Sequence, residues 1–197
     1  MLLHAANARA QTTGKVAIGA SFTNRTALGN GAGDSKGPGF AWRIGHDKTG
    51  WGWHYGLNWF STSVDRSIGG SDVDLGELRV RPLMGGYGYT FVTRRTSFAL
   101  DMLAGYSFNK MTLSARAADA YRSLGALDVN TAVRNSIVAR PELNIWQDVN
   151  RKMGINVNIG YTFARPRVLV RTPLGVDDHR VRADMLAVTV GAVYRIF

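Results

Sequence analysis

Residues 153–163 read MGINVNIGYTF, and this stretch decides the fold because the character of its side chains alternates with a period of two. One face is apolar and carries Ile155, Val157, Ile159, Tyr161 and Phe163. The other face is small or polar and carries Gly154, Asn156, Asn158, Gly160 and Thr162. Successive side chains of a β-strand point to opposite faces, so this period predicts a strand. A face of amides and glycines does not suit a dry core, so it must meet water or other polar groups.

The same alternation recurs along most of the chain and predicts an all-β protein of about eight strands. It is clearest at 51–59, 98–108 and 188–196, and weaker at 16–22, 40–44, 78–91 and 137–145.

Some positions interrupt the pattern. Leu78 and Val80 have the opposite parity to the aromatic residues further along the same strand, which predicts a β-bulge near the glycine pair 85–86. Proline removes a ladder hydrogen bond, so we expect a strand edge or a bulge at Pro82 and at Pro141.

Short and long connections alternate between the predicted strands. The short ones lie at 47–50, 93–95 and 148–152, and the long ones at 24–37, 62–76, 109–134 and 165–180. This alternation predicts an antiparallel up-and-down meander with all tight turns at one end, which closes into a barrel and so removes its exposed edges. Alanines at 115, 117, 118 and 120 favour a short surface helix within 113–124.

The character of the two faces indicates which one is inside. A soluble barrel such as a lipocalin carries charges outward, whereas a membrane barrel has an apolar outer band, aromatic girdles and a polar lumen. Here the residues opposite the apolar face are mostly Gly, Asn, Ser and Thr. Aromatic residues gather toward both strand ends, as in the two belts of a membrane protein. We therefore expect an eight-stranded antiparallel transmembrane β-barrel, with a soluble lipocalin-like binding barrel as the alternative fold.

Composition fits one domain. The chain has 197 residues, 23 glycines, no cysteine, 19% charged residues and a net charge of +10. No cysteine means no disulfide scaffold and no thiolate metal site. Ala8-Arg9-Ala10 followed by Gln11 is typical of a signal-peptidase site, so we interpret 1–10 as the remnant of an export signal and 11–197 as a single barrel domain.

Two further stretches carry a family resemblance. Residues 81–89, RPLMGGYGY, are similar to the RPYxGxGxGY strand of small eight-stranded outer-membrane barrels, with Leu83 in place of the usual aromatic residue. The terminal VGAVYRIF, residues 190–197, is similar to the final strand that the barrel-assembly machinery reads, with Tyr194 and Phe197 as the signal residues. Tyr194 stands three places before the terminus rather than two, which is a departure from that pattern. Nearly all of residues 11–197 thus resemble the outer-membrane protein A/X-like and "porin family" barrels of Gram-negative bacteria, which implies the bacterial outer membrane as location.

The residues of inward parity include a group of charged side chains. We expect a lumen ionic network formed by Arg43, Arg79, Arg81, Asp101, Arg140 and Glu142. An unpaired ion in a narrow lumen costs several kcal/mol, so these charges must be paired. The network either plugs the barrel or, as the resemblance implies for some relatives, acts as a gate at Glu142 with Arg140 or Arg81.

Basic residues also gather in the last long connection. Guanidinium groups bind phosphate bidentately, so a surface-loop anion site for lipopolysaccharide phosphates is expected at Arg165, Arg167, Arg171 and Arg180. The expected partners are therefore outer-membrane lipid, lipopolysaccharide and the assembly machinery. Nothing in the pattern suggests a nucleic-acid surface.

Enzymatic chemistry is not expected. Outer-membrane deacylases use a His-x-Ser pair, but His54 is followed at that spacing by Gly56 and His46 by Lys48. Asp177-Asp178-His179 resembles a pair found in outer-membrane proteases only superficially, and no metal site or cofactor is expected. The sequence therefore favours an envelope-integrity or surface-interaction role, with a small gated pore as the alternative function.

Overall fold

The computed structural model describes residues 16–196 except positions 30, 45–47, 127 and 174. In chain order these residues form β1 (Val16–Ala27), β2 (Ser35–Ile44), β3 (Gly50–Leu57), β4 (Phe60–Ile68), β5 (Ser71–Thr93), β6 (Thr96–Leu113), α1 (Ala115–Ser123), β7 (Asn130–Arg134), β8 (Ser136–Asp148), β9 (Met153–Ala164), β10 (Arg167–Thr172), β11 (Gly175–Arg180) and β12 (Met185–Arg195). Among them no helix is long and apolar enough to cross a membrane.

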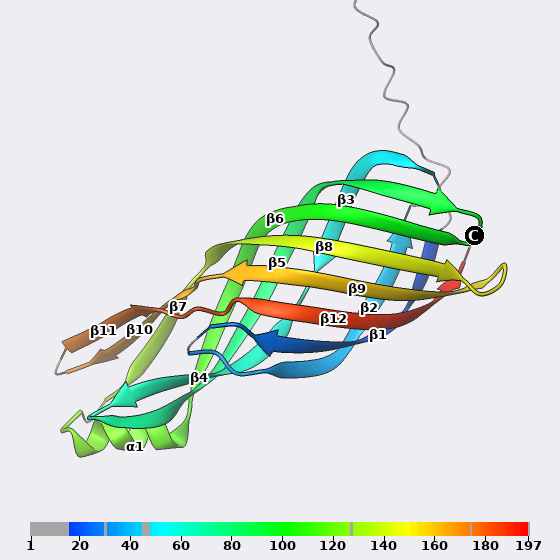
Figure 1. Cartoon of the computed structure of the whole chain (residues 1–197). Coiled ribbons are helices and arrows are strands. Elements are labelled where there is room, and N and C mark those ends of the chain that lie inside the picture. Colours follow the sequence, from blue (N-terminus) through cyan, green and yellow to red (C-terminus); the bar gives the residue numbers. More distant parts are fainter. Residues whose placement is uncertain (1–15, 30, 45–47, 127, 174, 197) are drawn as a thin grey trace, which may run out of the picture.

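The main sheet is an antiparallel meander with the order β2-β1-β12-β9-β8-β6-β5-β3, and β4 continues β3 along β5. Figure 1 shows its strands running side by side from a tight-turn end, where the C-terminus lies, toward a long-loop end. If β3 and β4 are counted as one interrupted strand, the main sheet has the eight strands that the sequence predicts.

Pro82 explains the interruption between β3 and β4. β3 ends at the pair Leu57↔Leu83 and β4 begins at Phe60↔Val80, with the same register on both sides. This register sets Asn58 opposite Pro82, which has no N–H to donate to the ladder. The strand edge or bulge predicted at Pro82 is therefore not found, since β5 continues through it in register with β6, and the proline leaves a gap between β3 and β4 instead.

The other irregularities differ from the predictions. β5 pairs with β6 in one unbroken register from Gly76 to Thr93, so the bulge predicted at the glycine pair 85–86 is wrong. Pro141 leaves a gap in the β8–β9 ladder without changing its register. The register shift lies instead between β4 and β5 at Val64/Asp65.

The apparent parity change in β5 has a different cause. Leu78, Val80 and Met84 face inward and are buried, on the same side as Gly86 and Gly88. The wall keeps its register while the lumen changes from polar to apolar. The long-loop half of the interior is thus an apolar core, which includes Phe60, Leu103, Val138 and Met185 and continues to Ala117 of α1.

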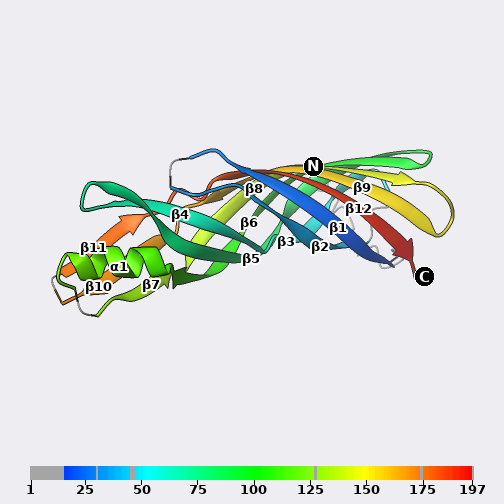
Figure 2. The ribbon, with the colours of Figure 1, turned by 90° about the horizontal axis from the view of Figure 1, so that it is seen from below.

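The long connections contain regular structure. The β4–β5 hairpin extends beyond the wall and contacts α1, which forms within the predicted 113–124. Ser114 caps α1, since its Oγ accepts a hydrogen bond from the Ala117 N–H at 3.0 Å. β7, β10 and β11 form a second antiparallel sheet beyond the wall (Figure 2).

The outer wall of the barrel is apolar. Trp51, Trp53 and Tyr55 on β3 are 68%, 70% and 69% exposed, and Leu100 and Met102 on β6 are 68% and 58% exposed. Aromatic pairs stand at both ends of this band, such as Trp51 stacked on Tyr87 with ring centroids 5.6 Å apart. Such a wall suits lipid rather than water.

Introducing a charged residue into this apolar band tests whether the wall faces lipid. Met102→Arg is expected to destabilise the barrel in a phospholipid bilayer by about 2–4 kcal/mol, because Met102 faces outward near the middle of the band. Urea unfolding in liposomes, read as the mobility shift in SDS before and after boiling, measures the loss. Thr112→Arg is the matched control, since Thr112 lies on the same face of β6 beyond the band. Equal stability of the two variants would contradict a lipid-facing wall.

Candidate functional site

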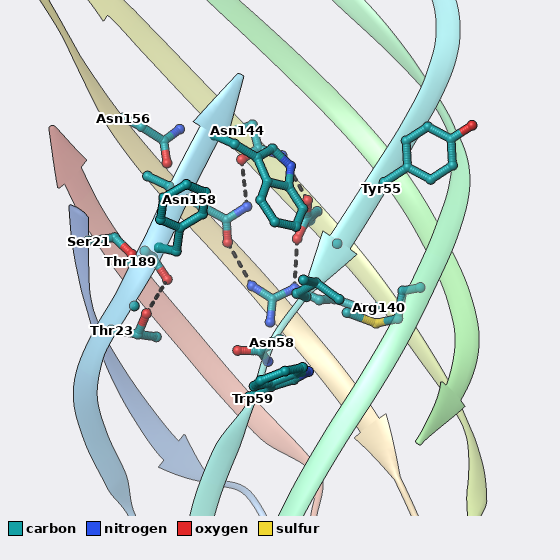
Figure 3. Close-up of a pocket in the computed structure, with 18 of the residues that line it drawn as sticks. Ser21, Thr23, Tyr55, Asn58, Trp59, Arg140, Asn144, Asn156, Asn158 and Thr189 are labelled. Carbon is teal, nitrogen blue, oxygen red and sulfur yellow. Dashed lines mark hydrogen bonds and ion pairs between the residues drawn. The ribbon is translucent and has the colours of Figure 1, made fainter. Parts of the chain in front are cut away.

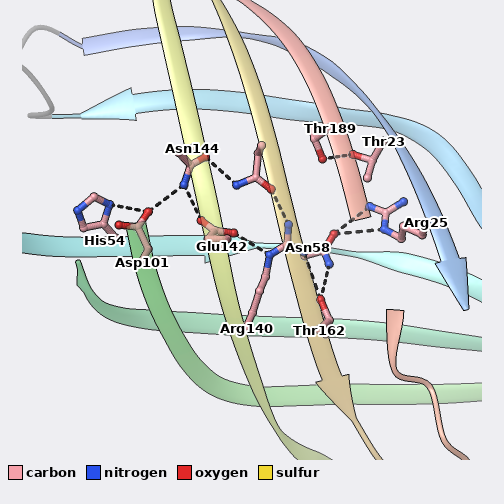
Figure 4. A network of polar contacts seen from close by, with 11 residues as sticks. Thr23, Arg25, His54, Asn58, Asp101, Arg140, Glu142, Asn144, Thr162 and Thr189 are labelled. Carbon is pink, nitrogen blue, oxygen red and sulfur yellow. Dashed lines mark hydrogen bonds and ion pairs between the residues drawn. The ribbon is translucent and has the colours of Figure 1, made fainter. Parts of the chain in front are cut away.

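A network of buried polar side chains occupies the middle of the lumen, and Arg140 of β8 is its centre (Figure 4). The Arg140 guanidinium donates to Glu142 Oε2 at 2.7 Å, to Asn158 Oδ1 at 2.7 Å and to Thr162 Oγ1 at 3.2 Å. Glu142 shares the inward face of β8, while Asn158 and Thr162 face inward from the neighbouring β9.

One arm of the network runs toward β6 and β3. Asn144 Nδ2 donates to Glu142 Oε1 at 2.8 Å and to Asp101 Oδ2 at 2.9 Å. His54 Nδ1 lies 3.2 Å from the same Asp101 oxygen. The Asn158 amide donates to Asn144 Oδ1 at 2.7 Å, which closes a ring with Arg140 and Glu142.

The other arm runs toward β1. Asn58, in the interruption between β3 and β4, donates to Thr162 Oγ1 at 3.3 Å and accepts from Arg25 Nη2 at 2.9 Å. The contacts therefore run from His54 on β3 across β6, β8 and β9 to Arg25 on β1.

The charges of this network balance. Arg25 and Arg140 oppose Asp101 and Glu142, and Arg25, Asp101 and Arg140 are only 6%, 3% and 4% exposed. Desolvated ions are tolerated in such a place only when they are paired and hydrogen-bonded. Removal of a single member is therefore costly, because it leaves an opposite charge buried without compensation.

Two glycines make room for the buried charges. A Cβ at position 160 would lie 2.6 Å from Nε and Nη2 of Arg140. A Cβ at position 88 would collide with Oδ1 of Asp101. Glycines on the inward face of the strands thus leave the space that the Arg140 guanidinium and the Asp101 carboxylate occupy.

The structure gathers some of the charged residues that the sequence nominated. Asp101, Arg140 and Glu142 lie together in the network. Arg79 and Arg81 do not, because they alternate with the buried Leu78 and Val80 and so face outward. Their expected place in the lumen is corrected, and the error follows from the predicted bulge.

One residue of the expected network cannot be placed, and the observed network has further members that were not expected. The Arg43 side chain lies outside the described residues. Arg25, Asn58 and Thr162 were not expected in the network, although the period of two had placed Thr162 on the polar face. Arg25 has the inward parity of Ser21 and Thr23, but its position in a predicted loop concealed it.

A pocket of about 370 Å³ opens beside the network, between β2 and β3 (Figure 3). β2 and β3 are the two ends of the strand order, and no pairing joins them within the part of the chain that the structure describes. The interior of the pocket carries the apolar Ala41, Met84 and Trp146 and a set of polar side chains, which are Ser21, Thr23, Asn144, Asn156, Asn158 and Thr189. Its rim is apolar and aromatic, with Phe40, Trp42, Tyr55, Leu57 and Trp59.

Apolar side chains flank the polar layer of the lumen on both sides. The apolar core fills the long-loop half, and Ala17, Ala41, Trp146 and Val193 form a smaller cluster toward the tight-turn end. The polar network therefore lies between two apolar clusters, and Ala41 and Trp146 of the smaller one also line the pocket.

The basic residues of the last long connection are partly paired. Arg165 lies 3.7 Å from the buried Asp184, and Arg167 lies 3.2 Å from Asp178. Arg167 stands directly between Arg134 and Arg180 across β7, β10 and β11. Arg171 is exposed further along β10. The second sheet thus aligns Arg134, Arg167 and Arg180 in a row, which the sequence did not predict.

A separate cluster joins the β4–β5 hairpin to the β10–β11 hairpin. Arg66 Nη2 lies 2.9 Å from Asp177 Oδ1, and His179 Nδ1 lies 3.7 Å from Asp177 Oδ2. Burial, followed by the nearby Arg66 charge, lowers the pKa of His179 below its usual value. Among the described residues no group of three or more His, Cys, Asp or Glu side chains is arranged to hold a metal ion.

Of the residues expected to form signals at the two chain ends, the structure describes Tyr194. Tyr194 faces outward on β12 and is 50% exposed. Phe197 and the export-signal remnant 1–10 lie outside the described residues. The assembly signal and the export signal stay predictions.

Comparison with known proteins identifies the fold. No protein-family model matches the chain, and no curated protein matches it significantly. Among solved structures, the outer membrane protein OprG from Pseudomonas aeruginosa matches with a TM-score of 0.72 at 14% identity, over 94% of this chain and 97% of that one. The outer membrane protein AlkL, determined in lipid bilayers, matches with a TM-score of 0.52 at 10% identity, over 92% of this chain and 89% of that one.

A third match is Ail, the attachment invasion locus protein of Yersinia pestis, in a complex with a heparin analogue. It matches with a TM-score of 0.50 at 13% identity, over 93% of this chain and 97% of that one. The protein thus has the fold of the small outer-membrane β-barrels. This fold and the exposed apolar band together place it in the outer membrane, which confirms the resemblance and the location that the sequence indicated.

Gly160 offers a direct test of the lumen geometry. Gly160→Ala is expected to lower the stability of the barrel by about 1–3 kcal/mol, because the new methyl group displaces the Arg140 guanidinium from its partners. The temperature at which the SDS mobility shift occurs measures this effect. Gly37→Ala is the control, since Gly37 is also in a wall strand and a Cβ there has no neighbour within 4 Å. An equal effect of both substitutions would mean that strand propensity, rather than the network, explains the loss.

Proposed function

We propose that this protein is a non-enzymatic, integral outer-membrane barrel without a steady axial pore, which serves envelope integrity and contact with its surroundings. The observation that carries this proposal is the charge-balanced network from His54 to Arg25. A water-filled pore needs a continuous polar path, whereas this lumen has its polar layer between two apolar ones.

The network also supports a structural role. It connects side chains from β1, β3, β6, β8 and β9, so it braces strands that are not neighbours in the sheet. A lumen whose polar layer lies between two apolar clusters suits a stable wall element better than a general diffusion pore.

Lipopolysaccharide is the proposed partner outside the barrel. The long-loop end carries the row of Arg134, Arg167 and Arg180, and among the described residues Asp178 is the one carboxylate paired with it. Like charges directly opposite one another on a sheet are unfavourable without a counter-ion, and phosphate is a matching one. The proposed role of the C-terminal strand in recognition by the assembly machinery is independent of this site.

Two measurements test the closed lumen. The wild-type barrel in planar lipid bilayers is expected to show no steady openings, because both apolar layers stay in place. Glu142→Ala is expected to lower stability by about 3–5 kcal/mol, since it leaves the buried Arg140 without its carboxylate partner.

The double variant Arg140→Ala with Glu142→Ala is expected to lose less stability than Glu142→Ala alone, because it removes one charge of each sign. Asp119→Ala on α1 is the matched control, since it breaks an exposed ion pair with Arg122. Steady openings of the wild type would overturn the proposal, and so would a Glu142→Ala barrel as stable as the control.

The pocket between β2 and β3 favours a second function, in which small amphipathic solutes enter the lumen from the side. A partly polar interior behind an aromatic rim suits a molecule with one apolar and one polar end. This function is the small gated pore of the sequence analysis, with its opening in the wall rather than along the axis.

The absence of cysteine makes this opening easy to probe. Ser21→Cys, in the pocket, is expected to react with N-ethylmaleimide in liposomes at least tenfold faster than Ser107→Cys. Ser107 is the matched control because it faces inward among the fully buried residues. Thiol labelling followed by mass spectrometry gives both rates. Equal protection of the two cysteines would exclude a side entrance.

A further inference from the structure

The outer face of β5 changes character abruptly toward the long-loop end. From Phe91 to Leu83 its outward side chains are aromatic, apolar or glycine, and then follow Arg81, Arg79 and Glu77. On the neighbouring β6, the outward Phe108 lies opposite Arg81 and the outward Lys110 lies opposite Arg79. The apolar band thus ends in a basic border, at the depth where lipid tails give way to headgroups.

Four cations converge at this border. Arg79 lies directly opposite Lys110 across the β5–β6 ladder. Arg81 is two residues along the same face, or about 7 Å away. Lys36 of β2 joins Arg79 and Arg81 in the lining of a second pocket of about 400 Å³, between β2 and β4–β5. The end of the barrel wall where β2 meets β4 therefore carries a recess with cations on both sides.

The recess is not neutralised by the protein itself. Glu77 pairs with Arg79 at 3.1 Å and is the one acidic residue in the pocket lining. Arg25 also lines the pocket, but its guanidinium is bound to Asn58 in the lumen. Without Arg25, the lining has a formal charge of +2, from three positive charges (Lys36, Arg79 and Arg81) and one negative charge (Glu77), and Lys110 adds a further positive charge beside Arg79 on β6.

The remaining lining suits a lipid headgroup. Ser61 contributes a hydroxyl, and Trp59 lies under Arg81, whose Cζ is 5.9 Å from the indole ring centre. Trp59 is 59% exposed, so an apolar ring, a cation and a hydroxyl border one opening on the outer wall. Phe108, directly opposite Arg81 on β6, and Leu83, the next outward residue of β5, present an apolar surface on which acyl chains can lie.

We propose that this recess is a binding site for a phosphorylated glycolipid of the outer leaflet, with Arg79, Arg81, Lys110 and Lys36 holding its phosphate groups. The guanidinium groups supply paired N–H donors and the lysines supply point charges. The site differs from the arginine row on the second sheet, because it lies on the wall at the membrane border. It rests on the proposed lipopolysaccharide partner but not on a closed lumen.

Binding of purified bisphosphorylated lipid A in neutral detergent tests the site. Arg79→Gln with Arg81→Gln is expected to weaken binding at least about tenfold, since each basic residue near a membrane surface contributes appreciably to binding anionic lipid. Dephosphorylated lipid A is expected to bind the wild type as weakly as bisphosphorylated lipid A binds the double variant. Excess inorganic phosphate is expected not to displace the lipid, because the acyl chains hold it against Leu83 and Phe108.

The controls separate a local site from net charge and from folding. Arg116→Gln with Arg122→Gln on α1 changes the net charge equally and is expected to leave binding unchanged, since both residues are exposed away from the wall. Glu77→Gln is expected to tighten binding, because it removes the opposing charge while keeping a hydrogen-bond acceptor. The SDS heat shift establishes that each variant is folded.

Wild-type affinity in the Arg79/Arg81 variant would overturn the proposal, as would equal binding of dephosphorylated lipid or equal losses in the α1 variant. Displacement by inorganic phosphate would show an anion site without a lipid ligand, which also contradicts the proposal. The conductance measurement is separate, so a conducting barrel that binds lipid A at this site would refute only the closed lumen.

Discussion

The backbone hydrogen-bond ladder is the constraint on which the rest of this structure depends. In lipid every N–H and C=O of the wall needs a partner within the protein, and antiparallel neighbours supply it along the meander from β2 to β3. Once the ladder holds a strand in register, each side chain is directed either to lipid or to the lumen. The unbroken register of β5 with β6 is the clearest example, because it sends Arg81 outward and Met84 inward within one strand.

The lumen follows from this sorting of side chains. Inward positions near the long-loop end are apolar and pack as a core, while those in the middle are amides, hydroxyls and a few ions. The ions are tolerated because they balance and because Gly88 and Gly160 leave space for them. The interruption opposite Pro82 places Asn58 where it connects Arg25 to Thr162. A residue that weakens the ladder thus creates a position that the network uses.

The strand register also decides which side chains lie on the outer surface. Apolar side chains cover the wall over the membrane, and basic residues begin where the outward face of β5 reaches Arg81. Beyond the wall, α1 and the second sheet add further cations, including the row at Arg134, Arg167 and Arg180. The net charge of +10 is therefore not uniform, since much of it lies at the border and at the long-loop end.

The sequence by itself determined the strand class, the number of wall strands, the inside-out arrangement and the surface helix, because these depend on a local period of two and on local turn composition. It also nominated Asp101, Arg140 and Glu142, whose parity is unambiguous within well-patterned strands. Only the tertiary structure decided the parity of Arg79 and Arg81, the roles of Arg25 and Asn58, and the alignment of three arginines on a second sheet. These depend on register across strands and on contacts between residues far apart in the chain, such as Asn58 with Thr162. A local pattern carries no information about such pairings. The inward face of β5 changes from small to apolar residues, and the sequence pattern alone made this change look like a β-bulge.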